Sequence, residues 1–355
     1  MQSIYRLTRT LLVLSALSVF ASMAWGQTLV GPGTVIPDTS EISDQKAGSV
    51  LVYNFYSSSA VAPNLENTRI NITNIHPTSS VAVHLFFIDG TTCSPADAFV
   101  CLTPNGTATF VTSDIDPGIR GYVIAVASDK ASGCPIYFNY LVGDEYVKLA
   151  SGHQANLGAE AISALFGGGV VGATLPGCSA ASVTAVLVFD GAPNTDGYNK
   201  LPRTLVLDHF QSQADGNDTC VVLNRIGGPN PAGTGPFSDL TTSALPIGPL
   251  FAIVYDDAEQ PFSVSFSAST CQLKLALSSL RTLGGGLNAV VPSGRSGWMS
   301  IRPMTTDLGL LGAVLNFNAS AAQSVSAYNG GHNLHKVTLT TGPQYLIIPI
   351  FPPFC

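Results

Sequence analysis

Residues 68–89 constrain the fold more than any other part of the chain, because they contain two strand-like segments on either side of a turn. In the first segment Ile70 and Ile72 alternate with polar residues, which is the period expected of a strand with one buried face. The second segment, residues 81–88, is apolar at nearly every position, as in a central strand covered on both faces. Similar short segments, each ended by turn residues, recur along the chain. We therefore expect an all-β protein.

The first 26 residues have the pattern of a cleaved signal peptide. Arg6 and Arg9 precede an apolar run at residues 11–23, and Ala24 and Gly26 provide small residues before the expected cleavage point. The apolar run is shorter than the ~20 residues that a membrane-spanning helix needs. We expect cleavage before Gln27, a mature chain without a transmembrane span, and a location that is secreted, either extracellular or periplasmic.

The chain carries unusually few charges. Charged residues make up 10% of the sequence, against roughly 25% in ordinary globular proteins. Removal of Arg6 and Arg9 leaves 13 basic residues against 22 acidic ones, a net charge of −9. Nucleic acids are poor partners for such a chain, since no basic cluster is present. A surface with little charge lacks the repulsion that keeps chains apart, which favours contact with copies of itself or with other extracellular surface components.

The strand patterns predict two β-sandwich domains, Ig-like or jelly-roll-like, separated by a glycine-rich passage. Asn156 is placed to cap a short helix at residues 157–166, which would end the first domain. The predicted order is a signal peptide at 1–26, a polar leader at 27–48, an N-terminal sandwich at 49–166, a glycine-rich linker at 167–180 and a C-terminal sandwich at 181–355.

Seven cysteines in an exported chain indicate disulfides. We expect Cys93 and Cys101 to close a local loop. Cys220 with Cys271 and Cys134 with Cys178 are further candidate pairs, although six cysteines allow about 15 connectivities and the spacing leaves the pairing open. Cys355 is then the unpaired residue, either free or linking two chains.

Five segments carry a resemblance to a known family. They are residues 67–74, 83–90, 114–118, 138–148 and 330–335. They resemble an uncharacterised family of exported, β-rich bacterial proteins that has no assigned activity. The resemblance implies a bacterial source and export, and it brings no catalytic residues with it.

The candidate metal ligands are His332, His335, Asp256 and Asp257. The two histidines have HxxH spacing, but side chains three apart on a strand point to opposite faces, so joint binding needs a bend. The two aspartates lie in an acidic turn whose oxygen atoms could hold calcium. The chain also has one adjacent acid–histidine pair, Asp208 with His209, but it lacks the GxSxG elbow of a serine hydrolase.

These patterns predict an exported structural or adhesive protein that associates with itself or with other surface components. We expect no enzyme activity and no cofactor apart from calcium. A first alternative is a carbohydrate- or ligand-binding module that uses loops at one end of a sandwich. A second is a secreted hydrolase whose site is assembled from distant loops.

Overall fold

The computed structural model describes residues 42–355, except for 194–195, 230–237, 283–284, 305–306 and 321–328. These residues belong to one compact unit of the chain. The predicted signal peptide and most of the predicted leader lie outside them.

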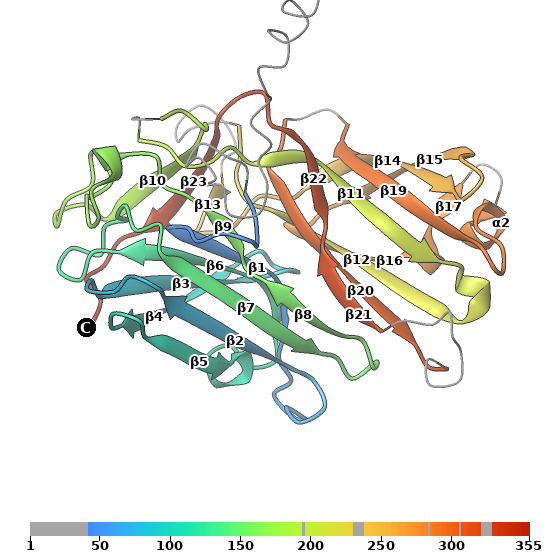
Figure 1. The fold of residues 1–355 in the computed structure, drawn as a ribbon, viewed down its shortest axis with the longest axis horizontal. Helices are drawn as coiled ribbons and strands as arrows, with labels where there is room; N and C mark the ends of the chain where they lie inside the picture. Colours follow the sequence, from blue (N-terminus) through green and yellow to red (C-terminus); the bar gives the residue numbers. More distant parts are fainter. Residues whose placement is uncertain (1–41, 194–195, 230–237, 283–284, 305–306, 321–328) are drawn as a thin grey trace, which may run out of the picture. The chain divides into compact units, whose positions relative to one another are not determined.

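The structure is all-β: strands account for 54% and helices for 6% (Figure 1). The helical segments are short, namely η1 (Thr112–Asp114), η2 (Gly167–Gly169), η3 (Gln213–Asp215), η4 (Leu277–Ser279) and α2 (Leu287–Val290). None of the helices in the described part of the chain is long and apolar enough to cross a membrane. The predicted helix at 157–166 is wrong, because Leu157 and Ile162 lie on short strands and pack into different hydrophobic clusters.

The first two sheets share the strands of the N-terminal part of the chain. One has the order β4-β3-β6-β1-β9 and the other β5-β2-β7-β8. Their strands are β1 (Val50–Ser57), β2 (Asn67–Asn74), β3 (Val81–Asp89), β4 (Pro95–Leu102), β5 (Thr107–Val111), β6 (Arg120–Ser128), β7 (Leu141–Lys148), β8 (Gln154–Gly158) and β9 (Glu160–Ile162). The two strands predicted at 68–89 are present, but they belong to different sheets. β3 pairs on both sides and is buried up to Asp89, as expected of a central strand.

The rest of the chain forms three larger sheets and one short ribbon. Their orders are β10-β23-β13, β15-β14-β19-β11-β22, β16-β12-β20-β21 and β17-β18. The strands are β10 (Thr184–Phe189), β11 (Pro202–Gln211), β12 (Asn217–Arg225), β13 (Ser238–Asp239), β14 (Gly248–Asp256), β15 (Pro261–Ala268), β16 (Gln272–Ala276), β17 (Arg281–Thr282), β18 (Gly285–Gly286), β19 (Ser296–Pro303), β20 (Leu310–Asn318), β21 (Gly330–Asn333), β22 (His335–Leu339) and β23 (Gln344–Pro349).

The five larger sheets are arranged as a five-bladed β-propeller, so the prediction of two β-sandwich domains is wrong. Propeller blades are typically four-stranded sheets, whereas these sheets have three to five strands and combine strands that are distant in sequence. Residues 167–180, predicted to be a linker between domains, are instead attached to the folded core. Leu175 is buried in a hydrophobic cluster, and Cys178 is bonded to Cys134.

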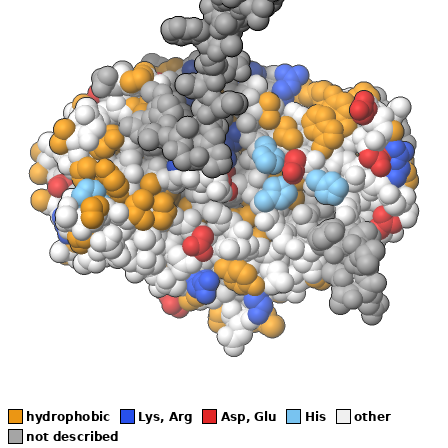
Figure 2. All heavy atoms as spheres, viewed as in Figure 1, with side chains coloured by type: hydrophobic (Ala, Val, Ile, Leu, Met, Phe, Trp, Pro, Cys, Tyr) orange, Lys and Arg blue, Asp and Glu red, His pale blue; other side chains and the backbone are white. Residues whose placement is uncertain are grey.

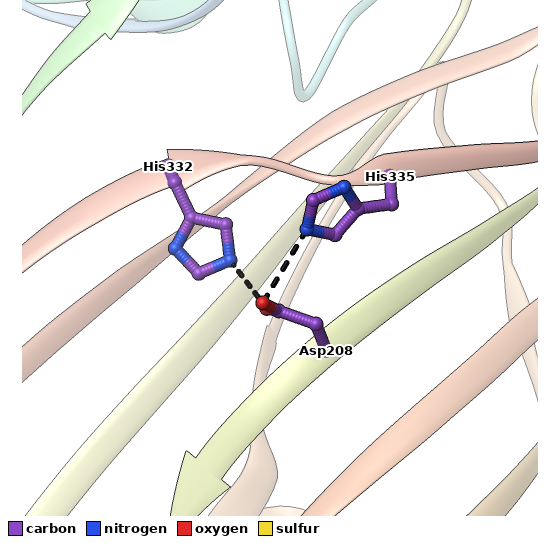
Figure 3. A group of neighbouring side chains, drawn as sticks. All are labelled: Asp208, His332 and His335. Atoms are coloured by element: carbon purple, nitrogen blue, oxygen red, sulfur yellow. Dashed lines mark hydrogen bonds and ion pairs between the residues drawn. The ribbon is translucent and has the colours of Figure 1, made fainter. Parts of the chain in front are cut away.

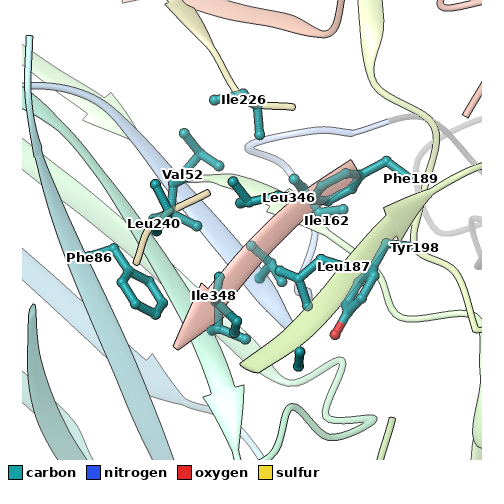
Figure 4. Packing of buried hydrophobic residues seen from close by; sticks show 14 of the residues in the cluster. Val52, Phe86, Ile162, Leu187, Phe189, Tyr198, Ile226, Leu240, Leu346 and Ile348 are labelled. Carbon is teal, nitrogen blue, oxygen red and sulfur yellow. The ribbon is translucent and has the colours of Figure 1, made fainter. Parts of the chain in front are cut away.

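One hydrophobic cluster joins the two halves that the sequence suggested (Figure 4). Val52 and Phe86 from the first sheet pack in it with Leu187 of β10 and with Leu346 and Ile348 of β23. All five side chains are almost completely removed from solvent. A division of the chain near 167–180 would expose part of this core, which explains why the halves do not form separate domains.

Three disulfides fix the chain: Cys93–Cys271, Cys101–Cys355 and Cys134–Cys178. The last was predicted, and the other two correct our pairing of Cys93 with Cys101 and of Cys220 with Cys271. Most of the segment from Cys93 to Cys101 is the extended strand β4 and spans about 26 Å at 3.3 Å per residue, far beyond the reach of a disulfide. The unpaired cysteine is Cys220, whose thiol is buried, and not Cys355 as predicted.

Candidate metal centre

Three side chains from three strands meet where two sheets adjoin. Asp208 lies on β11, His332 lies on β21, and His335 begins β22. β22 is the edge strand of one sheet and pairs with β11, while β21 is the edge strand of the next sheet. The group therefore lies at the margin of both sheets, where β8 (Gln154–Gly158) contacts β21 but leaves the three ligand side chains open to solvent.

A β-bulge places Asp208 at the surface. The register between β11 and β19 shifts after Leu207, so that Asp208 and His209 together lie opposite the single residue Trp298. Both side chains are exposed, although consecutive residues of a regular strand point to opposite faces. Bulges commonly redirect side chains in this way.

The turn between β21 and β22 brings the two histidines to one side. Leu334 separates the strands, is buried in the cluster beneath them, and donates its N–H to the carbonyl of Gly312 at 2.9 Å. Asn333 is also buried, and its side-chain amide donates to Asp44 Oδ2 at 2.9 Å and to the Gly158 carbonyl at 2.7 Å. These two inward anchors provide the bend that HxxH spacing requires on a strand.

Both imidazoles point towards the same carboxylate (Figure 3). His332 Nε2 lies 2.9 Å from Asp208 Oδ1, and His335 Nε2 lies 3.4 Å from Asp208 Oδ2. One ligand atom of each residue lies within 4.8 Å of the other two. The side chains are 51% exposed at Asp208, 40% at His332 and 60% at His335, so a solvated ion can reach all three.

The site favours an ionised carboxylate. Partial burial acts to raise the pKa of Asp208, but the neighbouring His332 and His335 outweigh it, and the pKa lies below its ordinary value. Asp208 is therefore ionised at neutral pH, which is the form that binds a metal ion.

The three residues line a groove of about 560 Å³ together with Ser43, Asp44, Gln45, Asn333, Leu334 and Lys336. Lys336 does not add a free positive charge to it, because its ammonium lies 2.8 Å from the buried carboxylate of Glu160. Figure 2 shows histidine side chains gathered beside an acidic one, with hydrophobic side chains nearby on the same face. Trp298 and Val337 are the exposed apolar residues of β19 and β22.

Asp256 and Asp257, the other predicted metal ligands, belong to a separate ion-paired turn. Asp256 is buried and accepts the backbone N–H groups of Ala258 and Gln260. Asp257 accepts a hydrogen bond from Arg295, whose guanidinium also lies 3.8 Å from Asp256. Arg295 thus offsets part of their negative charge, and neither residue joins the group around Asp208.

The donor set of Asp208, His332 and His335 suits a first-row transition metal. Two imidazole nitrogens and one carboxylate oxygen are typical ligands of Zn²⁺, which binds them at about 2.0–2.2 Å. Around a tetrahedral ion at that distance, ligand atoms are about 3.3 Å apart. The two nitrogen-to-oxygen separations, 2.9 Å to Oδ1 and 3.4 Å to Oδ2, are close to this value, and the three ligand atoms lie within 4.8 Å of one another, so rotation of the side chains could bring them around one ion.

Sequence reasoning identified both histidines and missed their partner. Asp208 drew attention only beside His209, whereas in the structure it contacts residues more than 120 positions later. The available signal was an aspartate–histidine pair that interrupts the apolar alternation of a predicted strand, as a bulge does. No family model matches the chain, and no curated protein matches it, so the assignment of this site depends on its geometry.

Proposed function

We propose that this protein is an exported metal-binding protein that holds one zinc-class ion through Asp208, His332 and His335. One observation carries the proposal: two Nε2 atoms and a carboxylate from three strands lie within 4.8 Å of one another at the surface. The three disulfides are consistent with an extracellular or periplasmic location. The structural or adhesive role predicted from the sequence remains part of the proposal, with the metal as its cofactor.

Calorimetric titration of the metal-free protein with Zn²⁺ tests this proposal. We expect one ion per chain. The substitutions His332→Ala and His335→Ala should each lower the affinity by at least about 100-fold, because each removes a direct ligand, whereas loss of a supporting contact typically costs 10- to 100-fold. Asp208→Asn should also weaken binding, since an amide carries no charge.

Asp257→Asn is the matched control, because it makes the same chemical change at the other predicted acidic site. It should bind zinc as the wild type does. Unchanged zinc affinity in His332→Ala and His335→Ala would contradict the proposal, and loss of binding in Asp257→Asn alone would place the ion in the acidic turn.

A second candidate function, carbohydrate binding, is favoured by one aromatic pair. Tyr255 and Trp298 lie opposite each other on β14 and β19, with ring centroids 4.3 Å apart and an interplanar angle of 9°. Trp298 is 38% exposed, and aromatic rings of this kind can stack on sugars. A glycan-binding screen that reads retention of the protein on immobilised sugars tests this function. Binding that survives Trp298→Ala would remove the pair from consideration.

A further inference from the structure

We propose that the metal ion joins two copies of this chain, with His209 of each copy supplying the fourth ligand to the ion of the other. The inference rests on the proposed metal site and extends it to an interaction surface. Four features of the described residues support it: an incomplete ligand set, an open margin, a bulge that exposes His209, and exposed apolar residues beside the site.

The ligand set is incomplete within one chain. Structural zinc sites are almost always four-coordinate. Among the described residues, one group of histidine, cysteine, aspartate or glutamate side chains is close enough together to bind one ion. It consists of Asp208, His332 and His335. The fourth position is taken by water, as in catalytic zinc sites, or by a protein side chain from outside this group.

The three ligand side chains can be reached from solvent. β21 and β22 are both edge strands, and the three ligands are between 40% and 60% exposed. Zinc sites that work with a bound water are usually set in a cleft that excludes solvent. Exposure on this scale is better suited to a ligand that arrives from a second molecule.

His209 is placed to be that ligand. It follows Asp208 in the bulge and is exposed. Its imidazole forms no hydrogen bond or ion pair in the described part of the chain. In a two-fold dimer of this kind, the metal site of each copy and the His209 that it contributes to its partner must both lie close to the symmetry axis. Consecutive residues meet this condition, so one axis can pair each His209 with the partner's Asp208 site.

The surroundings of the site also favour contact. Val337 is 55% exposed on β22, and Trp298 is 38% exposed opposite the bulge. Burial of these side chains would add apolar contact area around the ions. With only 10% charged residues in the whole chain, little electrostatic repulsion opposes the approach of a second copy.

Sedimentation velocity of the purified protein, first with a chelator and then with one equivalent of Zn²⁺, tests the proposal. We expect a monomer without metal and a dimer holding one zinc per chain with it. His209→Ala should remain monomeric and still bind one zinc per chain through its three other ligands, with the weaker affinity expected after loss of one ligand, whereas His332→Ala should lose both binding and pairing. Asp257→Asn should dimerise like the wild type.

Two results would overturn the pairing and leave the metal site intact. One is a zinc-loaded wild-type chain that stays monomeric, which would mean that water or His209 of the same chain completes the site. The other is a His209→Ala variant that dimerises as readily as the wild type. A wild-type chain that binds no zinc at all would overturn the proposed function itself.

Discussion

At the scale of single residues, His84 is buried without a full set of hydrogen-bond partners, and this burial governs its protonation. Its imidazole is completely buried and packs against the rings of Phe86 and Phe99, with centroids 4.1 Å away in each case, and against Phe351 at 5.2 Å. Burial lowers the pKa of His84 to about 4, although Asp97 at 3.4 Å acts in the opposite direction. The folded protein therefore keeps this histidine neutral at pH values where the unfolded chain would protonate it.

This difference makes the protein sensitive to acid. Because the pKa of His84 is lower in the folded state than its usual value of 6.5, the stability it contributes is complete above pH 6.5 and is lost as the pH falls towards 4. The loss amounts to about 3 kcal/mol. We predict that His84→Phe loses less free energy of unfolding than the wild type between pH 7 and pH 4, as measured by urea denaturation.

The exposed substitution His209→Ala is the control for this measurement and should keep the pH dependence of the wild type. Equal pH dependence in His84→Phe and the wild type would show that His84 titrates normally in the folded protein.

At the scale of elements, strands could be predicted and their neighbours could not. The alternation of Ile70 and Ile72 and the apolar run of β3 correctly indicated one half-buried and one central strand. Those patterns do not show that β2 and β3 belong to different sheets, because the alternation depends only on which face of a strand is buried. The helix predicted at 157–166 failed because a short apolar stretch fits either period.

The candidate site shows the same limit. HxxH spacing on a strand needs a bend, and the bend arises where β21 ends in one sheet and β22 begins in another. It depends on Asn333, which also accepts a hydrogen bond from Asn54 at 2.9 Å. The contacts of Asn333 join residues between 175 and 289 positions apart, so local sequence carries no signal of them.

We predict that Asn333→Ala weakens both the fold and the site. Loss of the buried hydrogen bonds should cost about 2 kcal/mol of unfolding free energy. Zinc affinity should fall by about 10-fold or more, since the residue holds the bend between the two ligands without touching the ion. Thr338→Ala, which removes an exposed hydroxyl of β22 and its hydrogen bond to Thr204, is the control; it should cost less than about 1 kcal/mol and leave zinc affinity unchanged. Wild-type zinc affinity in a folded Asn333→Ala variant would show that the bend forms without this anchor.

At the scale of the whole molecule, contacts between distant segments decide the architecture. Cys93–Cys271 and Cys101–Cys355 close loops across 178 and 254 residues, and the cluster around Phe86 and Leu346 joins the same parts of the chain. Sequence reasoning favoured nearby partners, and so it paired Cys93 with Cys101 and divided the chain at a glycine-rich stretch. The recurring strand and turn patterns did predict the all-β class, since that property requires no knowledge of which strands meet.

On the proposed function, Asp208, His332 and His335 form one metal centre. Anomalous diffraction at the zinc edge, from crystals of the zinc-loaded protein, tests it most directly. We predict a peak at about 2.0–2.2 Å from Nε2 of both histidines and from a carboxylate oxygen of Asp208. A zinc ion bound elsewhere, with this group free of anomalous signal, would contradict the claim.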